Sequence, residues 1–256
     1  MKRRLLVAVL LVAAAVWGVA SWRIVPSSAQ AQWSWPEKSK NLKVLPKDTD
    51  AQRLRMVMGA FTRALGVRCW YCHVGKEGQP LGEYDFASDE NPKKNVARGM
   101  MRMVDSVNVT VKRMVPDDKD LVSVGCVTCH RGLPHPRTLV DELKMTYDKS
   151  GVDSTAARYR TLRTGFYGSG SYDFGEAALG EVARYAMEKK DSRGAMALAR
   201  LNVEQFPQSG NVQGMLAEVT LAAGDTTQAI QALEKAVQLD PRNERTKAML
   251  DRLKKR

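Results

Sequence analysis

The chain of 256 residues is long enough for one large domain or two modest ones. Its formal net charge of +12 is concentrated in the first 23 residues and the last fifteen, which leaves the middle of the chain at only about +3. This distribution argues against a nucleic-acid-binding protein and favours a basic, solvated C-terminal helix that can dock on anionic lipid or on an acidic partner.

The first 31 residues have the pattern of a targeting segment. A short basic stretch precedes sixteen apolar residues at positions 5–20, and Ala29-Gln30-Ala31 fits a small-residue cleavage site. The sequence therefore predicts a signal peptide or an N-terminal membrane anchor over residues 1–31, with cleavage and retention both open. Both outcomes predict an exported, periplasmic protein, which is anchored to the inner membrane if the segment is retained.

An amphipathic helix is predicted directly after residue 50, with Gly66 as its C-cap. Its apolar face consists of Leu54, Met58, Phe61 and Leu65, whereas Met56 points to another side. This helix leads into the first of two cysteine pairs.

All four cysteines fall in two identical frames, "CWYCH" at residues 69–73 and "CVTCH" at residues 126–130. A four-cysteine zinc site would not need the histidine that follows each pair. A thioredoxin-type dithiol needs one pair at the start of a helix in a βαβ unit, and no such strand pattern precedes either pair. A disulfide across two intervening residues would add little stabilisation.

Covalent haem attachment accounts for every residue of each frame. The two thiols form thioethers with two porphyrin vinyl groups, and the next residue lies under the ring, where its imidazole binds the iron. The sequence therefore predicts two covalently attached c-type haems, the first held by Cys69 and Cys72 with His73 as iron ligand, the second by Cys126 and Cys129 with His130.

The sixth ligand of each iron decides the chemistry, because methionine opposite histidine raises the reduction potential. The third histidine, His135, lies in a proline-flanked loop and is most simply an exposed residue. Met58 can be ordinary core packing, since methionine fills irregular gaps. A haem placed immediately after its helix would instead take its sixth ligand from the face that carries Met58.

The candidates for the second haem lie between the two frames. A helical face within residues 91–108 consists of Val96, Met100, Met103, Val104 and Val107, and Met101 lies off this face. Periodicity does not choose between Met100 and Met103. Met114 competes with both because it precedes Cys126 by twelve residues, although Pro116 follows it closely.

From about residue 41 to residue 139 the chain resembles the cytochrome subunit of purple-bacterial photosynthetic reaction centres. The resemblance rests on "NLKVL", on M-x-x-F followed by "ALGVRCWYCH", on "FASDENPKKNVARGMMRMVDSVN" and on "VGCVTCHRG". It implies helix–turn–frame units in which Met58 binds the first haem iron and Met100 the second. The family subunit has four haems and this chain has two frames, so the chain resembles one half of that subunit or the two-haem relatives of non-photosynthetic bacteria.

A 34-residue period predicts tetratricopeptide-like repeats over residues 177–256. The matching pairs are Gly180 and Gly214, Ala183 and Ala217, Ala195 and Ala229, and Pro207 and Pro241. The last helix is charged on its outer side and is predicted to be a solvating cap. Residues 141–176 are predicted to be a linker to the haem domain.

These patterns together predict a mainly α protein with a two-haem cytochrome c domain at residues 32–140 and the repeats behind the linker. The predicted function is electron transfer, without enzymatic activity, between a membrane redox complex or reaction centre and a second electron carrier. The repeats are predicted either to clad the haem domain or to bind a protein partner. The alternatives are a peroxidase-like two-haem enzyme with one open iron site and a repeat-based assembly module.

Overall fold

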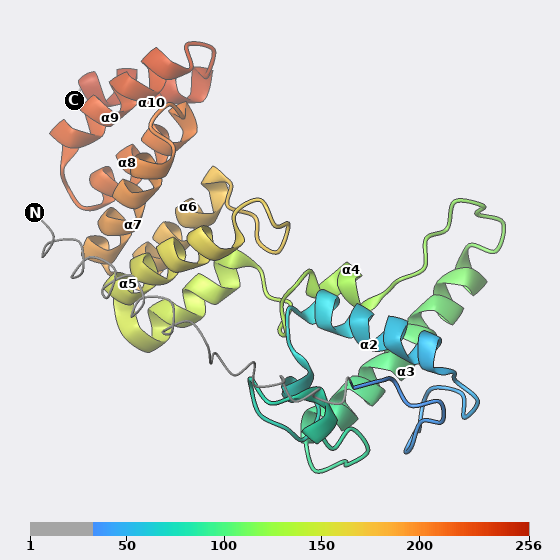
Figure 1. Cartoon of the computed structure of the whole chain (residues 1–256). Coiled ribbons are helices and arrows are strands. Elements are labelled where there is room, and N and C mark those ends of the chain that lie inside the picture. The colour runs from blue at the N-terminus through green and yellow to red at the C-terminus, as the bar shows by residue number, and fades with distance from the viewer. Residues whose placement is uncertain (1–32, 256) are drawn as a thin grey trace, which may run out of the picture.

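The computed structural model describes residues 33–255, and within them the regular elements are helical (Figure 1). An N-terminal lobe contains α2 (Ala51–Leu65), α3 (Pro92–Met114), α4 (Cys126–His130) and the 3₁₀ turns η1 (Cys69–Tyr71) and η2 (Leu81–Glu83). A C-terminal lobe contains α5 (Leu139–Phe166), α6 (Glu176–Glu188), α7 (Ser192–Gln205), α8 (Gly210–Ala222), α9 (Thr226–Leu239) and α10 (Glu244–Lys254). The prediction of a mainly α fold is confirmed.

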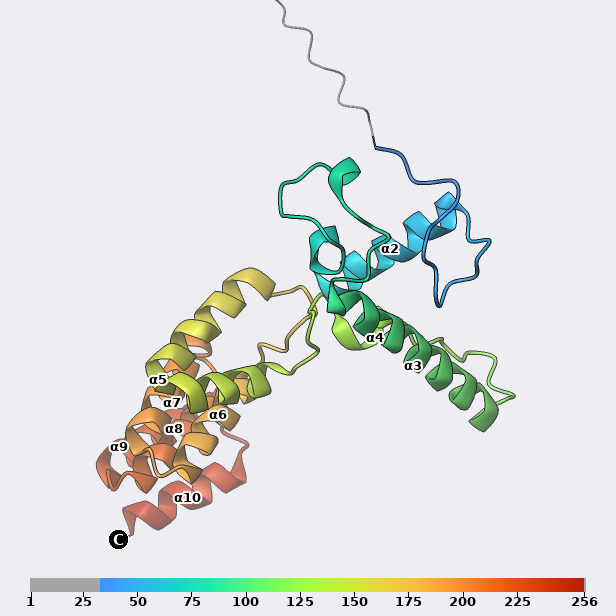
Figure 2. The ribbon, with the colours of Figure 1, turned by 90° about the horizontal axis from the view of Figure 1, so that it is seen from below.

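The two lobes lie side by side, and α3 extends away from the C-terminal lobe (Figure 2). The predicted targeting segment lies outside the described residues. Between residues 33 and 255, none of the helices combines the length and the apolar character that crossing a bilayer requires.

The C-terminal lobe is a stack of antiparallel helix pairs in the predicted 34-residue register. The starts of α6, α8 and α10 follow one another at intervals of 34 residues, and so do the starts of α7 and α9. Small residues sit where these helices cross, and the fully buried ones include Ala183, Ala195, Ala217 and Ala229. The sequence period therefore corresponds to one packing unit used twice, with α10 in the first-helix position of a third.

The segment predicted as a linker differs from the structure, because residues 139–166 form the two arms of α5. Gly151 (φ 75°, ψ −176°) interrupts the helix, and the Arg158 guanidinium of the second arm donates to the Glu142 carboxylate of the first at 2.6 Å. Leu143 and Tyr159 bring both arms into the same buried core as α6 and α7. We therefore include α5 in the C-terminal lobe as an additional helix pair.

The N-terminal lobe is organised by a close contact between the ends of α2 and α4. Gly66 ends α2 in the left-handed conformation (φ 66°), and the Gly132 amide just beyond α4 donates to the Ala64 carbonyl at 2.8 Å. A Cβ atom on Gly66 would lie 2.2 Å from the Gly132 carbonyl oxygen, so only glycine fits. Because Gly66 precedes the first frame and Gly132 follows the second, this contact sets the position of one frame relative to the other.

Helix α3 is fastened at two points, one near each frame. At its N-cap the Asn91 side chain donates to the Tyr71 carbonyl of the first frame at 3.1 Å. Further along the helix, Asn108 exchanges hydrogen bonds of 2.9 and 2.7 Å with the backbone of Val124, which leads into the second frame. α3 thus bridges the two frames.

Residues 33–50 form an irregular segment before α2, which we name the strap. The Asp89 carboxylate holds the strap in place by accepting hydrogen bonds from Lys43 (2.6 Å), Arg98 (2.8 Å) and Asn41 (2.9 Å). These donors, with Lys43 as the largest cause and Asn41 next, lower the pKa of Asp89 well below its ordinary value. Arg98 also donates to the Asn41 carbonyl at 3.1 Å, so the strap is tied to α3 through both side chain and backbone.

The contact between α2 and α4 predicts that Gly66→Ala destabilises the N-terminal lobe. The substitution combines left-handed backbone strain, typically about 1–3 kcal/mol, with a collision against the Gly132 carbonyl. Denaturant unfolding measures the loss. Gly78→Ala is the matched control, because Gly78 has φ 79° but nothing lies within 4 Å of the place that a Cβ atom would take there. Equal losses in the two variants would show that the collision contributes nothing.

The bonds to Asp89 predict that Asp89→Asn frees the strap. Because the pKa of Asp89 is lowered by folding, its contribution is present above the ordinary carboxyl pKa of about 3.9 and is lost as pH falls through the lower folded value. Limited trypsin digestion at neutral pH should therefore cleave at the strap lysines faster in Asp89→Asn. Glu90→Gln removes the same charge from the same loop and should digest like the wild type; similar digestion of all three proteins would contradict the role of Asp89.

Candidate functional site

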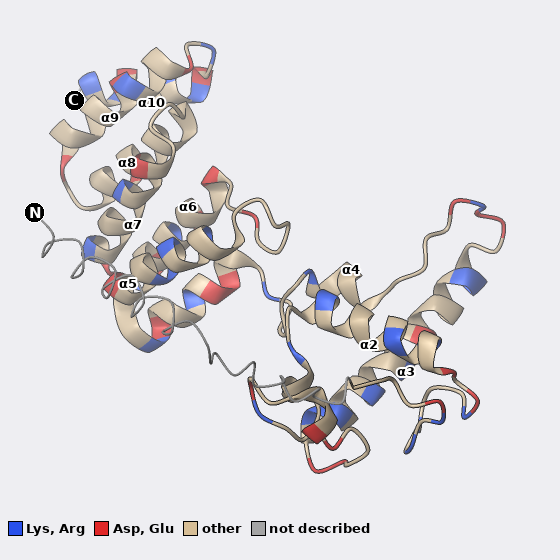
Figure 3. Ribbon diagram, viewed as in Figure 1, with Lys and Arg blue, Asp and Glu red and all other residues tan. Residues whose placement is uncertain are grey.

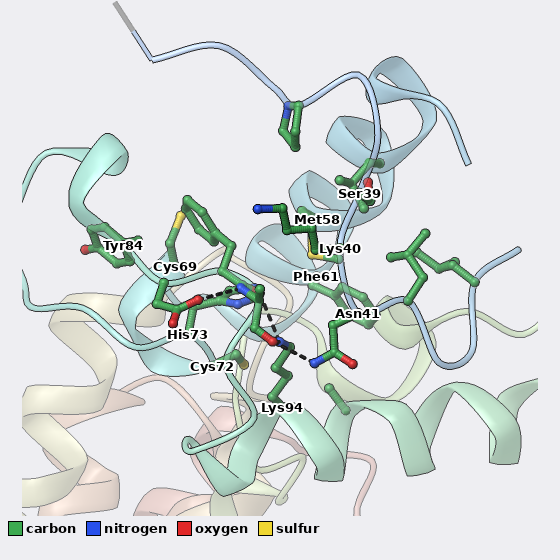
Figure 4. A pocket seen from close by; sticks show the side chains of 18 of the residues that line it. Ser39, Lys40, Asn41, Met58, Phe61, Cys69, Cys72, His73, Tyr84 and Lys94 are labelled. Atoms are coloured by element: carbon green, nitrogen blue, oxygen red, sulfur yellow. Dashed lines mark hydrogen bonds between the residues drawn. The ribbon is translucent and has the colours of Figure 1, made fainter. Parts of the chain in front are cut away.

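The first frame opens into an apolar cavity of about 400 Å³ between α2, α3 and the strap (Figure 4). Met58 of α2 and His73 approach this cavity from opposite sides, with Cys69 and Cys72 beside the histidine (Figure 4). The structure thus brings all four residues that the sequence assigns to the first haem to one cavity.

The apolar side chains of the N-terminal lobe are arranged around this cavity rather than in a closed core. Within residues 33–138, the buried apolar side chains are Leu54, Ala64 and Leu133. Many of the other aliphatic and aromatic groups line the cavity, among them Leu42, Val44, Leu45, Phe61, Leu65, Val67 and Phe86. A lobe of this construction is suited to a large apolar occupant that completes its core.

His73 is held in a partly buried, cationic environment. Burial is the main cause that lowers its pKa, the nearby Lys94 and Arg98 act in the same direction, and a contact with the backbone at Phe86 opposes them. The Phe86 ring meets the imidazole edge-on, with centroids 5.0 Å apart. Nδ1 of His73 is buried without a hydrogen-bond partner among the described residues. The lowered pKa favours the neutral imidazole, which is the form that ligates a metal.

The cysteines of both frames are unpaired thiols. Burial raises the pKa of Cys72 in the first frame and of Cys126 in the second. A raised pKa is the opposite of what a reactive redox dithiol requires. In the part of the chain from residue 33 to residue 255, no three His, Cys, Asp or Glu side chains converge as a metal-ligand cluster, so the two pairs do not form the shared site that a four-cysteine zinc centre needs.

The second frame forms the short helix α4 and presents its histidine in a defined orientation. The hydroxyl of Thr128 accepts from the Gly125 amide at 3.0 Å, which starts the helix. His130 is buried, and its Nδ1 lies 2.8 Å from the Leu133 carbonyl. With Nδ1 as the donor in this bond, Nε2 carries the free lone pair, which is the arrangement that orients histidines toward metals.

The methionines of α3 lie on different sides of that helix. Met101, which the apolar pattern leaves out, lines the first cavity together with Lys94, Ala97 and Arg98. Met100 is half-buried and is not part of that cavity wall. Met103 and Met114 are exposed, at 47% and 75%. The structure therefore brings Met58 to the first frame, whereas it does not place Met100 in the same cavity.

Sequence reasoning missed the charged wall of the first cavity. Lys94 donates to the carbonyls of three successive residues of one loop, Phe86 (2.9 Å), Ala87 (2.9 Å) and Ser88 (2.7 Å), and lies 3.3 Å from Asp89. The strap residues that close the cavity were also missed. In "SDENPKKNVAR" the residues Asn91 and Pro92 are typical of an ordinary helix start, so the sequence contains no separate signal that Lys94 and Arg98 face a cavity.

The residues of both frames fit covalently bound haem. The first site offers two neighbouring thiols, a neutral imidazole with an orphaned nitrogen, a thioether opposite, and apolar walls. The second offers two thiols and an oriented imidazole on one helix. A dithiol followed by histidine is the donor set of c-type attachment.

Two comparisons with known proteins lead to cytochromes. Residues 20–215 match the model of the family described as photosynthetic reaction centre cytochrome C subunit. Cytochrome c-554 of Chloroflexus aurantiacus (strain ATCC 29366 / DSM 635 / J-10-fl) is 32% identical over 118 residues, which cover 46% of this chain and 26% of that protein. The chain therefore spans about a quarter of the length of this relative.

One solved structure, the first TPR of Spaghetti (RPAP3) bound to an HSP90 peptide, shares 14% identity and a TM-score of 0.32 over 46% of this chain and 88% of that one. At this TM-score it supports no argument about the repeats. The family match, in contrast, extends over more than half of the chain and across both frames. It confirms the predicted resemblance and, for the family, the expectation of a cytochrome rather than an enzyme. The chain belongs to the photosynthetic reaction centre cytochrome C subunit family.

Proposed function

We propose that this protein is a periplasmic two-haem electron carrier that passes electrons between a membrane redox complex and a second carrier. The observation that supports it most is the convergence of Met58, Cys69, Cys72 and His73 on one apolar cavity. A photosynthetic reaction centre is one candidate for the membrane partner, in line with the family to which the chain belongs.

In this proposal each residue of the frames has a separate task. Cys69 and Cys72 anchor the first haem, and Cys126 and Cys129 the second. His73 and His130 are the proximal ligands, with Met58 as the sixth ligand of the first iron and Met100 of the second. A c-type haem supplies one-electron redox chemistry when bound.

In this proposal the chain contributes to electron transfer by fixing the geometry of both sites and by keeping water away from them. Apolar side chains exclude water from the first cavity, and the Leu133 carbonyl fixes the orientation of the His130 ring. Because the contact of Gly66 with Gly132 and the two anchors of α3 connect the frames, the spacing of the sites is built into the backbone. Little rearrangement is then needed when an electron arrives or leaves.

Location and further partners follow from the same proposal. The N-terminal segment exports the chain, and retention of that segment would attach it to the inner membrane. The helix pairs of the C-terminal lobe are a candidate surface for a protein partner. Positive and negative side chains are mixed over both lobes (Figure 3), which suits transient contacts with a partner better than binding to nucleic acid.

Haem stoichiometry tests the cofactor assignment. The wild type should contain two covalent haems per chain, as measured by the pyridine haemochrome spectrum together with the intact mass. Replacing Cys69 and Cys72 by serine, or Cys126 and Cys129 by serine, should leave one haem in each case, because each frame binds independently. Zinc instead of haem in the exported protein, or one haem in the wild type, would overturn the assignment.

Axial ligation tests the carrier function. The ferric spectrum should show two low-spin haems with methionine-to-iron charge transfer, and Met58→Ala and Met100→Ala should each abolish this band for one haem. Met56→Ala is the control on α2, and Met103→Ala and Met114→Ala are the controls on α3. A high-spin haem in the untouched protein would instead support the peroxidase-like alternative, and loss of the band in a control variant would reassign the ligand.

A further inference from the structure

The wall of the first cavity contains more cationic side chains than form ion pairs with acidic residues of the described chain. Six cationic side chains contribute to its wall, and three of them, Lys43, Lys94 and Arg98, have Asp89 as an acidic partner within 2.6–3.3 Å. The other three, Lys38, Lys40 and Arg68, form no ion pair with any residue between 33 and 255.

The described cavity wall offers a single carboxylate to these three cations, and it is partly engaged elsewhere. Asp85 is the one acidic residue among the described lining residues, and its Oδ1 accepts from the backbone amides of Ala87 and Ser88 at 2.9 Å each. These bonds commit one of its carboxylate oxygens to the turn that carries Phe86.

The strap also contains a hydroxyl group without a hydrogen-bond partner, next to Lys40 in the chain. The Oγ of Ser39 is buried and has no hydrogen-bond partner among the described residues. Its neighbour Lys40 reaches over the cavity beside Met58 (Figure 4). A buried hydroxyl without a partner is unfavourable, and a hydroxyl together with an ammonium group is a donor set for a carboxylate.

The attachment chemistry limits where a carboxylate can come from. A haem joined to Cys69 and Cys72 through its vinyl groups would have its propionate groups on the opposite edge of the porphyrin, away from the first frame. Arg68 adjoins Cys69 in the chain and lies at the thioether edge. Ser39 and Lys40 belong to the strap, on the far side of the cavity from Cys72 (Figure 4).

We propose that Ser39 and Lys40 bind a propionate carboxylate of the haem held at the first frame. The inference rests on the proposed function, and it makes the strap part of the haem site. The charges of the lobe agree with it, since residues 33–138 contain 18 Lys and Arg against 12 Asp and Glu. The Lys40 ammonium supplies the charge-assisted bond, and the Ser39 hydroxyl gains the acceptor that it otherwise lacks.

Infrared difference spectroscopy of the holoprotein tests the proposal. The haem propionate carbons are labelled with ¹³C through labelled 5-aminolevulinate, and reduced-minus-oxidised spectra identify the propionate bands by their isotope shift. Lys40→Gln and Ser39→Ala should each shift one labelled carboxylate band toward the position of a water-exposed carboxylate. Lys76→Gln, which removes an exposed lysine outside the cavity wall, should leave every band in place.

The thioethers keep the haem in place in all three variants, so a missing contact cannot be mistaken for a missing cofactor. Unshifted bands in both strap variants, with two low-spin haems present, would overturn this inference and leave the proposed function intact. A wild type without a covalent haem at Cys69 and Cys72 would overturn the proposed function, and the inference with it. Equal band shifts in Lys76→Gln would reduce the effect of Lys40 to general electrostatics and also overturn the inference.

Discussion

The contact between the end of α2 and the end of α4 is the constraint on which the N-terminal lobe depends. It joins the helix that leads into the first frame to the helix that carries the second, over a backbone approach that leaves no room for a Cβ atom on Gly66. Helix packing through side chains leaves neighbouring axes about 8–10 Å apart with considerable scatter in angle. A contact between backbones has far less freedom, so the spacing of His73 and His130 is set more tightly than side-chain packing alone could set it.

The two lobes are stabilised by different kinds of interaction. The C-terminal lobe buries two apolar clusters, one across α5 to α8 and one across α8 to α10, with Leu216 packed against both. Repeated helix pairs are stabilised in this way when each covers the apolar face of its neighbour. The N-terminal lobe arranges its apolar groups around a cavity and holds its loops by polar contacts, among them those of Asp89 and Lys94. Its stability is therefore tied to its occupant, as in other small domains whose cofactor forms part of the core.

Much of this organisation could be predicted from local pattern. The 34-residue period places the helices of the repeats in register, and the left-handed glycine at residue 66 ends α2 as expected. The features that the sequence pattern did not predict, α5 and the cations that line the cavity, share a physical cause. Apolar periodicity does not identify α5, because Gly151 interrupts this helix. The same periodicity places the charged side chains of Lys94 and Arg98 in solvent, whereas in the structure loop carbonyls and Asp89 bind them at the wall of a cavity. The partners of these two charges lie in the preceding loop, and only the folded course of that loop turns them toward the helix.

The attachment of the strap to Asp89 also fixes an order of events during biosynthesis. The strap is made first, but the groups that hold it, Asp89 and Arg98, follow the first frame in the chain. Until these residues emerge, the bonds that hold the strap against the cavity cannot form, so Cys69 and Cys72 are synthesised before the cavity can close. Enclosure of the first cavity therefore follows the synthesis of both cysteines, because the order of residues along the chain places the groups that hold the strap after them.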